Sequence, residues 1–235
     1  YLCKDLWVGK NVQMITAFKE FKNNIKVGIN LLIANLLGML IMGLGRFLIQ
    51  LFADLKDFAV YSFGISITGI VITAVTAFSL VLYPTIKRLN KSKYDIYFKN
   101  IKLSIIVFNF LVLLLYFICY WGIINFYNKF IEMLPYLNLL FVVAVLQGKM
   151  SVLNNTFYKI LRKEKAMLLV NIGSIIFFVI AAPLLFFFLE SIWSIAFVTF
   201  ITMMIRCYIS EAYLKKIMKI RLDYKFAIEI IFVVL

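Results

Sequence analysis

Three cations stand inside apolar runs of this sequence. Arg46 lies in "GMLIMGLGRFLIQLF", Lys149 follows "FVVAVLQG", and Arg206 follows "FITMMI". A cation among apolar residues needs a counter-charge, a polar partner or water. Several such cations in one chain would suit an anionic ligand, above all a phosphate or diphosphate group, which guanidinium and ammonium groups bind well.

Uncharged polar residues share faces with some of these cations when the runs are drawn as helices of about 100° per residue. In the first run Asn35, Arg46 and Gln50 fall on one arc. In the fourth run one stripe holds Gln147, Ser151, Asn154 and Tyr158, while Lys149 points the other way with Thr156. Arg206 shares a third stripe with Thr199, Thr202, Ser210 and Tyr213. Three of the predicted helices thus each carry a polar stripe on an apolar background.

Two other interpretations of these stripes remain open. Small and hydroxyl residues also serve helix packing in membranes, where they hydrogen-bond between helices. Arg46 and Arg206 lie near enough to span ends to extend their charged heads to an interface. Lys149 stands ten residues before Lys159, about 15 Å along a helix, so the sequence predicts a water-filled cavity or a buried partner for it.

Carboxylates follow a different pattern, because none is expected deep in a complete span. The acidic residues near the apolar runs all fall at their ends: Asp54, Asp57, Glu132, Glu190 and Glu211. Proton and sodium relays usually contain an intramembrane carboxylate. The pattern therefore favours an anion-binding cavity.

Composition determines which elements must position these residues. Hydrophobic residues make up 64% of 235 positions, charged residues 15%, and mean hydropathy is +0.99, which is far from the composition of soluble domains. Helices of about 20 apolar residues span a membrane and satisfy their own backbone groups. We predict an all-α polytopic membrane protein with six complete spans and a truncated seventh from about 226: Val27–Phe52, Phe58–Ile86, Ile101–Phe126, Leu134–Tyr158, Ala166–Leu189 and Ile192–Tyr213.

The formal charge of +14 is arranged by membrane side. Twenty of the 25 Lys and Arg residues lie before the first span or in alternate loops, whereas the opposite loops hold only Lys56 and Lys129. Positive loops stay in the cytoplasm, so we expect the N-terminal segment there and no nucleic-acid binding. The expected divisions are 1–26 (cytoplasmic segment), 27–213 (six-helix lobe), 214–225 (basic loop) and 226–235 (start of a further helix).

The sequence offers little for catalysis. It has no His, and Cys3, Cys119 and Cys207 are scattered without a metal-ligand spacing. Metal-binding, nucleophile-elbow and P-loop motifs are absent. We expect no enzyme activity, no metal and no cofactor. Because the chain starts at Tyr1 and ends inside an apolar run, we also expect it to be a piece of a longer protein.

Two stretches carry a family resemblance. Residues 25–89 include "KVGINLLIAN", a late Arg46, "FAVYSF" and "YPTIKRL", and the later stretch reads "LPYLNLLF…NNTFYKILRKEKAML". Together they resemble the second half of the polysaccharide and oligosaccharide-lipid flippases of the multidrug/oligosaccharidyl-lipid/polysaccharide (MOP) exporter superfamily. The resemblance covers nearly the whole chain. One departure is Gly45, where that family often has an acidic residue before the Arg.

The resemblance implies one lobe of a two-lobe, V-shaped transporter with a central cavity. Such a protein moves undecaprenyl-diphosphate-linked oligosaccharide units across the bacterial cytoplasmic membrane by alternating access, for O-antigen (lipopolysaccharide) or capsule synthesis. Partners would be the lipid-linked oligosaccharide, membrane lipid, and the polysaccharide polymerase and chain-length machinery. On this hypothesis Arg46, Lys149 and Arg206 bind the diphosphate, and Gln147, Asn154 and Asn35 contact sugar or water.

Other functions fit parts of the sequence. A cation-coupled multidrug exporter or a peptidoglycan-precursor flippase of the same superfamily would share the spans, although an exporter of cationic drugs is expected to have cavity carboxylates. A membrane polysaccharide polymerase or ligase usually needs a large outer loop, and the outer loops here are short. A purely structural subunit would not explain Lys149.

Overall fold

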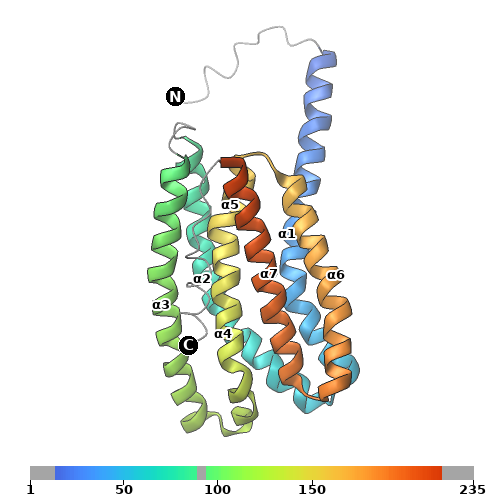
Figure 1. Ribbon diagram of the computed structural model, residues 1–235, viewed down its shortest axis with the longest axis vertical. Helices are drawn as coiled ribbons and strands as arrows, with labels where there is room; N and C mark the ends of the chain where they lie inside the picture. Colours follow the sequence, from blue (N-terminus) through green and yellow to red (C-terminus); the bar gives the residue numbers. More distant parts are fainter. Residues whose placement is uncertain (1–13, 89–93, 219–235) are drawn as a thin grey trace.

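The computed structural model describes residues 14–88 and 94–218, and all of its regular elements within these ranges are helices (Figure 1). The long helices run roughly parallel or antiparallel to one another, as in a bundle. In chain order the elements are α1 Met14–Phe52, α2 Leu55–Lys87, α3 Tyr94–Phe126, the 3₁₀ helix η3 Asn128–Met133, α4 Leu134–Lys149, the π-helical turn η4 Met150–Asn154, α5 Asn155–Ile160, α6 Glu164–Leu189 and α7 Ile192–Met218.

Five stretches of the described chain are long and apolar enough to cross a membrane: Ala17–Phe52, Leu55–Lys87, Asn128–Ile160, Glu164–Leu189 and Ile192–Met218. They match five of the six predicted spans, as a multi-pass membrane protein requires. The sixth predicted span lies in α3, an unbroken helix of 33 residues in which Leu114–Phe126 forms a shorter apolar stretch. The predicted start of a further helix at 226–235 lies outside the described residues.

The fourth predicted span is the central element of the bundle. About 61% of its membrane-length window is buried, against 17% for α1, because α2, α3 and α7 pack around α4. Its sequence predicts one continuous α-helix, but the structure contains the π turn η4 after Lys149. A π turn leaves a backbone carbonyl to find another donor. That of Ser151 accepts hydrogen bonds from the hydroxyls of Ser79 on α2 (3.0 Å) and Thr156 (3.4 Å).

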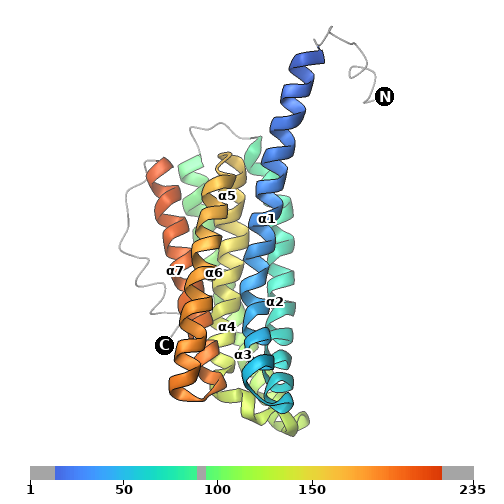
Figure 2. The same ribbon diagram turned by 90° about the vertical axis from the view of Figure 1, so that its right-hand side faces the viewer.

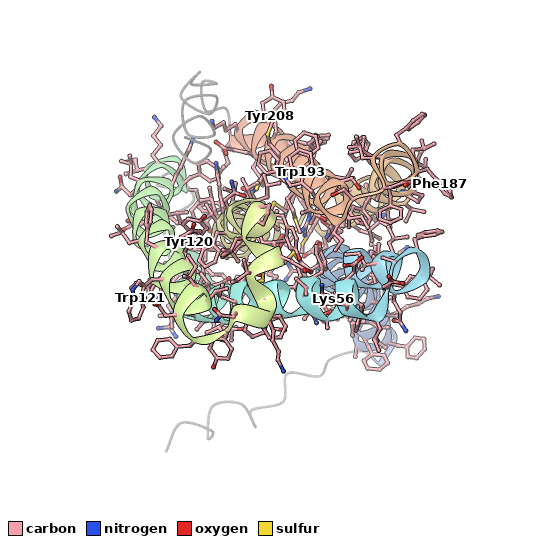
Figure 3. The ribbon with its side chains drawn as sticks, turned by 90° about the horizontal axis from the view of Figure 1, so that it is seen from below. Lys56, Tyr120, Trp121, Phe187, Trp193 and Tyr208 are labelled. Atoms are coloured by element: carbon pink, nitrogen blue, oxygen red, sulfur yellow. The ribbon has the colours of Figure 1, made fainter. Side chains whose placement is uncertain are left out.

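The outside of the bundle is strongly apolar. Large exposed side chains occur on its peripheral helices, including Met39, Ile70, Leu80 and Phe188, which are each at least 70% exposed. Figure 3 shows Trp121 and Phe187 projecting from the rim on α3 and α6. Such a surface is stable against lipid rather than water.

The two ends of the bundle differ in charge. The α5–α6 turn, with Arg162 and Lys163, lies at the same end as the last turns of α2 and α7 (Figures 1 and 2). At the opposite end Lys56 of α2 pairs with Glu132 of η3. The division agrees with the alternating charge of the loops in the sequence.

Membrane sidedness gives a direct prediction. In a background where Cys3, Cys119 and Cys207 are changed to Ala, a membrane-impermeant maleimide should label Lys129→Cys in intact cells. It should label Lys163→Cys only after the cells are made permeable, because basic loops stay in the cytoplasm. Equal labelling of both in intact cells, or the reverse order, would contradict the topology.

Candidate binding site in the helix bundle

Arg206 is the centre of a buried polar node. Its side chain is 1% exposed. Its Nε donates to Asn171 Oδ1 on α6 (2.8 Å), and its Nη1 donates to Gln147 Oε1 on α4 (3.0 Å). Asn171 Nδ2 in turn donates to the backbone carbonyl of Ala34 on α1 (2.6 Å). One guanidinium thus joins α7 to α4 and α6, and Asn171 extends the network to α1.

Gly38 makes room for this node. A Cβ atom added at Gly38 would lie 2.6 Å from Arg206 Nη2 and 3.7 Å from Asn171 Nδ2. Since real Cβ atoms do not approach so closely, any larger residue at Gly38 requires the guanidinium or α1 to shift. The side of α1 that meets the node carries Ala34 and Gly38, while Asn35 is half-buried.

Lys149 is paired with a buried carboxylate. Its Nζ lies 2.9 Å from Glu211 Oε2, and Glu211 is 2% exposed. Glu211 Oε1 also lies 3.0 Å from Lys102 Nζ on α3 and 2.8 Å from Lys215 Nζ on α7. We call Glu211, Lys102, Lys149 and Lys215 the Glu211 cluster.

This cluster places two residues singled out in the sequence against each other. Glu211 lies toward the end of α7, as the sequence predicted, but lysines of α3 and α4 cover it and it is buried. The buried partner that the sequence predicted for Lys149 is therefore this carboxylate. Lys149 was also expected to point away from Gln147, yet both side chains reach α7, because the long lysine chain extends around its helix.

Arg46 lies apart from the other two cations. It is half-buried on α1, and its Nη2 lies 3.4 Å from Ser66 Oγ on α2. Its Nε is buried and makes no hydrogen bond within the described part of the chain. The three cations of the predicted set thus do not converge in this structure: Arg206 of α7 bonds to α4 and α6, Lys149 pairs with Glu211 on α7, and Arg46 faces α2.

Besides Arg46 Nε, three buried hydroxyls on α2 and α4 make no hydrogen bond of standard geometry within the described chain. They belong to Tyr61 and Ser62 on α2 and to Tyr136 on α4. The centroids of the Tyr61 and Tyr136 rings lie 6.0 Å apart, and Tyr61 Oη lies against α1 at Gly45, the residue before Arg46. Buried groups of this kind usually bind water or a ligand.

Gly45, the residue before Arg46, leaves room for the Tyr61 hydroxyl. A Cβ atom there would lie 2.7 Å from Tyr61 Oη, so the tyrosine hydroxyl rests against the backbone of α1. The flippases that the sequence resembles often have an acidic residue at this position. Here such a side chain would collide with Tyr61, whose hydroxyl occupies the space that it would need.

The π turn changes the predicted stripe on the fourth span. Gln147 accepts a hydrogen bond from Arg206, whereas at Ser151, within the π turn, it is the backbone carbonyl that accepts one from Ser79 of α2. Asn154 is fully buried, and its Nδ2 lies 3.1 Å from Met150 Sδ of its own helix. Within residues 14–88 and 94–218, the Asn154 side chain thus bonds to its own helix rather than to the Arg206 node, and its Oδ1 makes no hydrogen bond.

Asn171 is among the site residues that sequence reasoning missed. A single amide inside "AMLLVNIGSIIFFV" was the available signal, since a buried polar residue in an apolar span needs a partner. The guanidinium, ammonium, amide and hydroxyl groups of this arrangement could bind an anion and form hydrogen bonds to a polar ligand. Within the described ranges there is no group of three His, Cys, Asp or Glu side chains that could hold a metal.

Comparison with known proteins adds no assignment: no protein-family model matches the sequence, and no curated protein or solved structure matches it.

Proposed function

We propose that this chain is one lobe of a flippase that moves undecaprenyl-diphosphate-linked oligosaccharides across the bacterial cytoplasmic membrane. Three features support the proposal: the resemblance of residues 25–89 and 134–168 to that family, the membrane-length helices, and cations within them. The observation that carries it is Arg46, a half-buried cation in a membrane-length helix, with an unsatisfied Nε among hydroxyl groups. That combination suits a phosphate oxygen.

Arg46 takes the leading part in this proposal. Its guanidinium is partly exposed, whereas Arg206 is sealed among four helices and already has two amide acceptors. We propose that Arg46 contacts the diphosphate first, with Tyr61 and Ser62 as further donors. Arg206, Gln147 and Asn35 would contact substrate only if α1 moves away from α6 and α7 during transport.

The rival functions are less well supported. An exporter of cationic drugs needs a carboxylate open to its substrate, but buried Glu211 is already held by three ammonium groups. A polymerase or ligase needs a catalytic loop, and the described turns at the end opposite the basic loops are short, such as Ala53–Asp54 between α1 and α2. A peptidoglycan-precursor flippase shares the prenyl diphosphate chemistry and remains the second candidate.

The test is deletion of the gene in its bacterial host. If the proposal is right, lipid-linked oligosaccharide accumulates on the cytoplasmic face and surface polysaccharide is lost. Normal surface polymer with altered drug sensitivity would favour the exporter, and a defect in the cell wall alone would favour the peptidoglycan-precursor flippase.

Complementation with Arg46 variants gives the next prediction. Arg46→Ala should reduce export roughly ten- to a hundredfold, because a charge-assisted hydrogen bond contributes about 1.5–3 kcal/mol. Arg46→Lys keeps the charge and should recover part of the activity. Lys129→Ala, an exposed cation on η3, is the control and should export normally. Full export by Arg46→Ala would exclude Arg46 from the substrate site.

A further inference from the structure

The Glu211 cluster has the geometry of an occupied anion site. Three ammonium groups from α3, α4 and α7 lie 2.8–3.0 Å from the two oxygens of one carboxylate. Lysine ammonium groups in such an arrangement bind phosphate oxygens in the same way as carboxylate oxygens. Glu211 therefore holds the position that an anionic ligand would take.

Fold stability alone is a weak reason for such a cluster. Glu211 is 2% exposed and its lysine partners 6–12%. Removing several charges from water is so unfavourable that well-packed apolar residues are often equally or more stable in their place. If the cluster opens and re-forms during function, its lysines can bind an anionic ligand while it is open.

The cluster also joins helices that otherwise touch little. In the described chain α3 packs mainly on α4 and η3, and it is not closely packed against α7. The ion pair between Lys102 and Glu211 nevertheless connects α3 to α7. Loss of this pair would release one end of α3 from α7 while leaving most of the packing of α3 intact.

We propose that Lys102, Lys149 and Lys215 form a diphosphate-binding site, and that Glu211 is its resident occupant until the lipid-linked substrate displaces it. The identity of the ligand rests on the proposed function. Exchange of one anion for another keeps the lysines paired, but the released carboxylate must reach water, which separates α7 from α3. The cluster lies near the last turns of α7, toward the basic end of the bundle, where a cytoplasmic substrate would enter.

Glu211→Gln tests the exchange. The amide keeps the shape but no longer competes as an anion, so the affinity for farnesyl diphosphate in nanodiscs should rise about tenfold, roughly 1.4 kcal/mol. Adding Lys102→Gln should remove that gain. Glu164→Gln is the matched control, because Glu164 is also a buried acid at this end of the bundle (9% exposed) and should leave affinity unchanged.

A distance measurement separates this role from simple structural support. Spin labels on Lys99→Cys and Lys216→Cys, both exposed, report the α3–α7 separation in a background with the native cysteines changed to Ala. Glu211→Gln and farnesyl diphosphate should each lengthen or broaden the distance distribution. If Glu211→Gln does not fold, Lys102→Gln leaves Glu211 paired with Lys149 and Lys215 and should lengthen or broaden the same distance distribution, whereas an unchanged distribution would overturn the proposal.

Three probes show whether the phosphate belongs to a lipid or is free. If Glu211→Gln raises the affinity for farnesyl diphosphate but not for inorganic pyrophosphate or farnesol, the ligand is a lipid diphosphate. If it raises the affinity for both diphosphates, the anion site holds with a free phosphate ligand. No gain for either, with unchanged distances, overturns the proposal. If deletion of the gene leaves polysaccharide export normal while Glu211→Gln still gains diphosphate affinity, the flippase function fails but the anion site holds.

Discussion

Asn171→Leu should destabilise the protein by about 3–5 kcal/mol, because it leaves the buried guanidinium of Arg206 without one of its two amide acceptors. The same change removes the donor to the Ala34 carbonyl, which links α6 to α1. The free energy of unfolding, measured by denaturant titration in detergent micelles, gives the size of this effect.

Removing both partners should be less harmful than removing one. Asn171→Leu/Arg206→Met deletes the buried charge together with its acceptor, so we expect part of the lost stability to return, since an apolar pair is often nearly neutral. Asn125→Leu is the matched control, because Asn125 is exposed and its side chain donates only within its own helix. If Asn171→Leu is no worse than this control, the node does not stabilise the bundle.

Gly38→Val should also destabilise strongly. A Cβ atom at this position would lie 2.6 Å from Arg206 Nη2, so α1 must move away or the guanidinium must leave Asn171 and Gln147. Overpacking of a well-packed interior usually contributes about 1–3 kcal/mol of destabilisation, and the lost hydrogen bonds add to it. Gly38→Ala should show a smaller effect of the same sign in the same unfolding titration.

Gly43→Ala is the control for this prediction on the same helix. No atom lies within 4 Å of a Cβ added at Gly43, and alanine favours helices over glycine by about 1 kcal/mol, so this variant should be neutral or slightly more stable. A double-mutant cycle of Gly38→Ala with Arg206→Met should show coupling. Additive effects would mean that Gly38 is not required for the approach of Arg206.

Helix positions were largely predictable, whereas the neighbours of each polar side chain were not. Apolar runs of membrane length restrict the backbone to helices, so five predicted spans overlap membrane-length helices of the structure, although α1 begins at Met14, well before the predicted start at Val27. The π turn after Lys149 was not predictable from periodicity, because one extra residue in a turn changes the face of every residue that follows.

The polar interior shows the same limit. A helical wheel gives the face on which Arg206 lies, but its partners Asn171 and Gln147 are 35 and 59 residues away in the chain. The pair of Lys102 and Glu211 is separated by 109 residues. Which faces meet depends on how the helices pack around α4, and that packing depends on side-chain volumes across several helices.

The sequence by itself determined that the chain consists of apolar, membrane-length helices with basic loops at one end, because length, hydropathy and charge act locally along the chain. Only the tertiary structure decided that Arg206 is held by amides beside Gly38, that Glu211 is buried among three lysines, and that Arg46 stands apart against α2. The physical reason is that a buried charge is defined by what surrounds it in space.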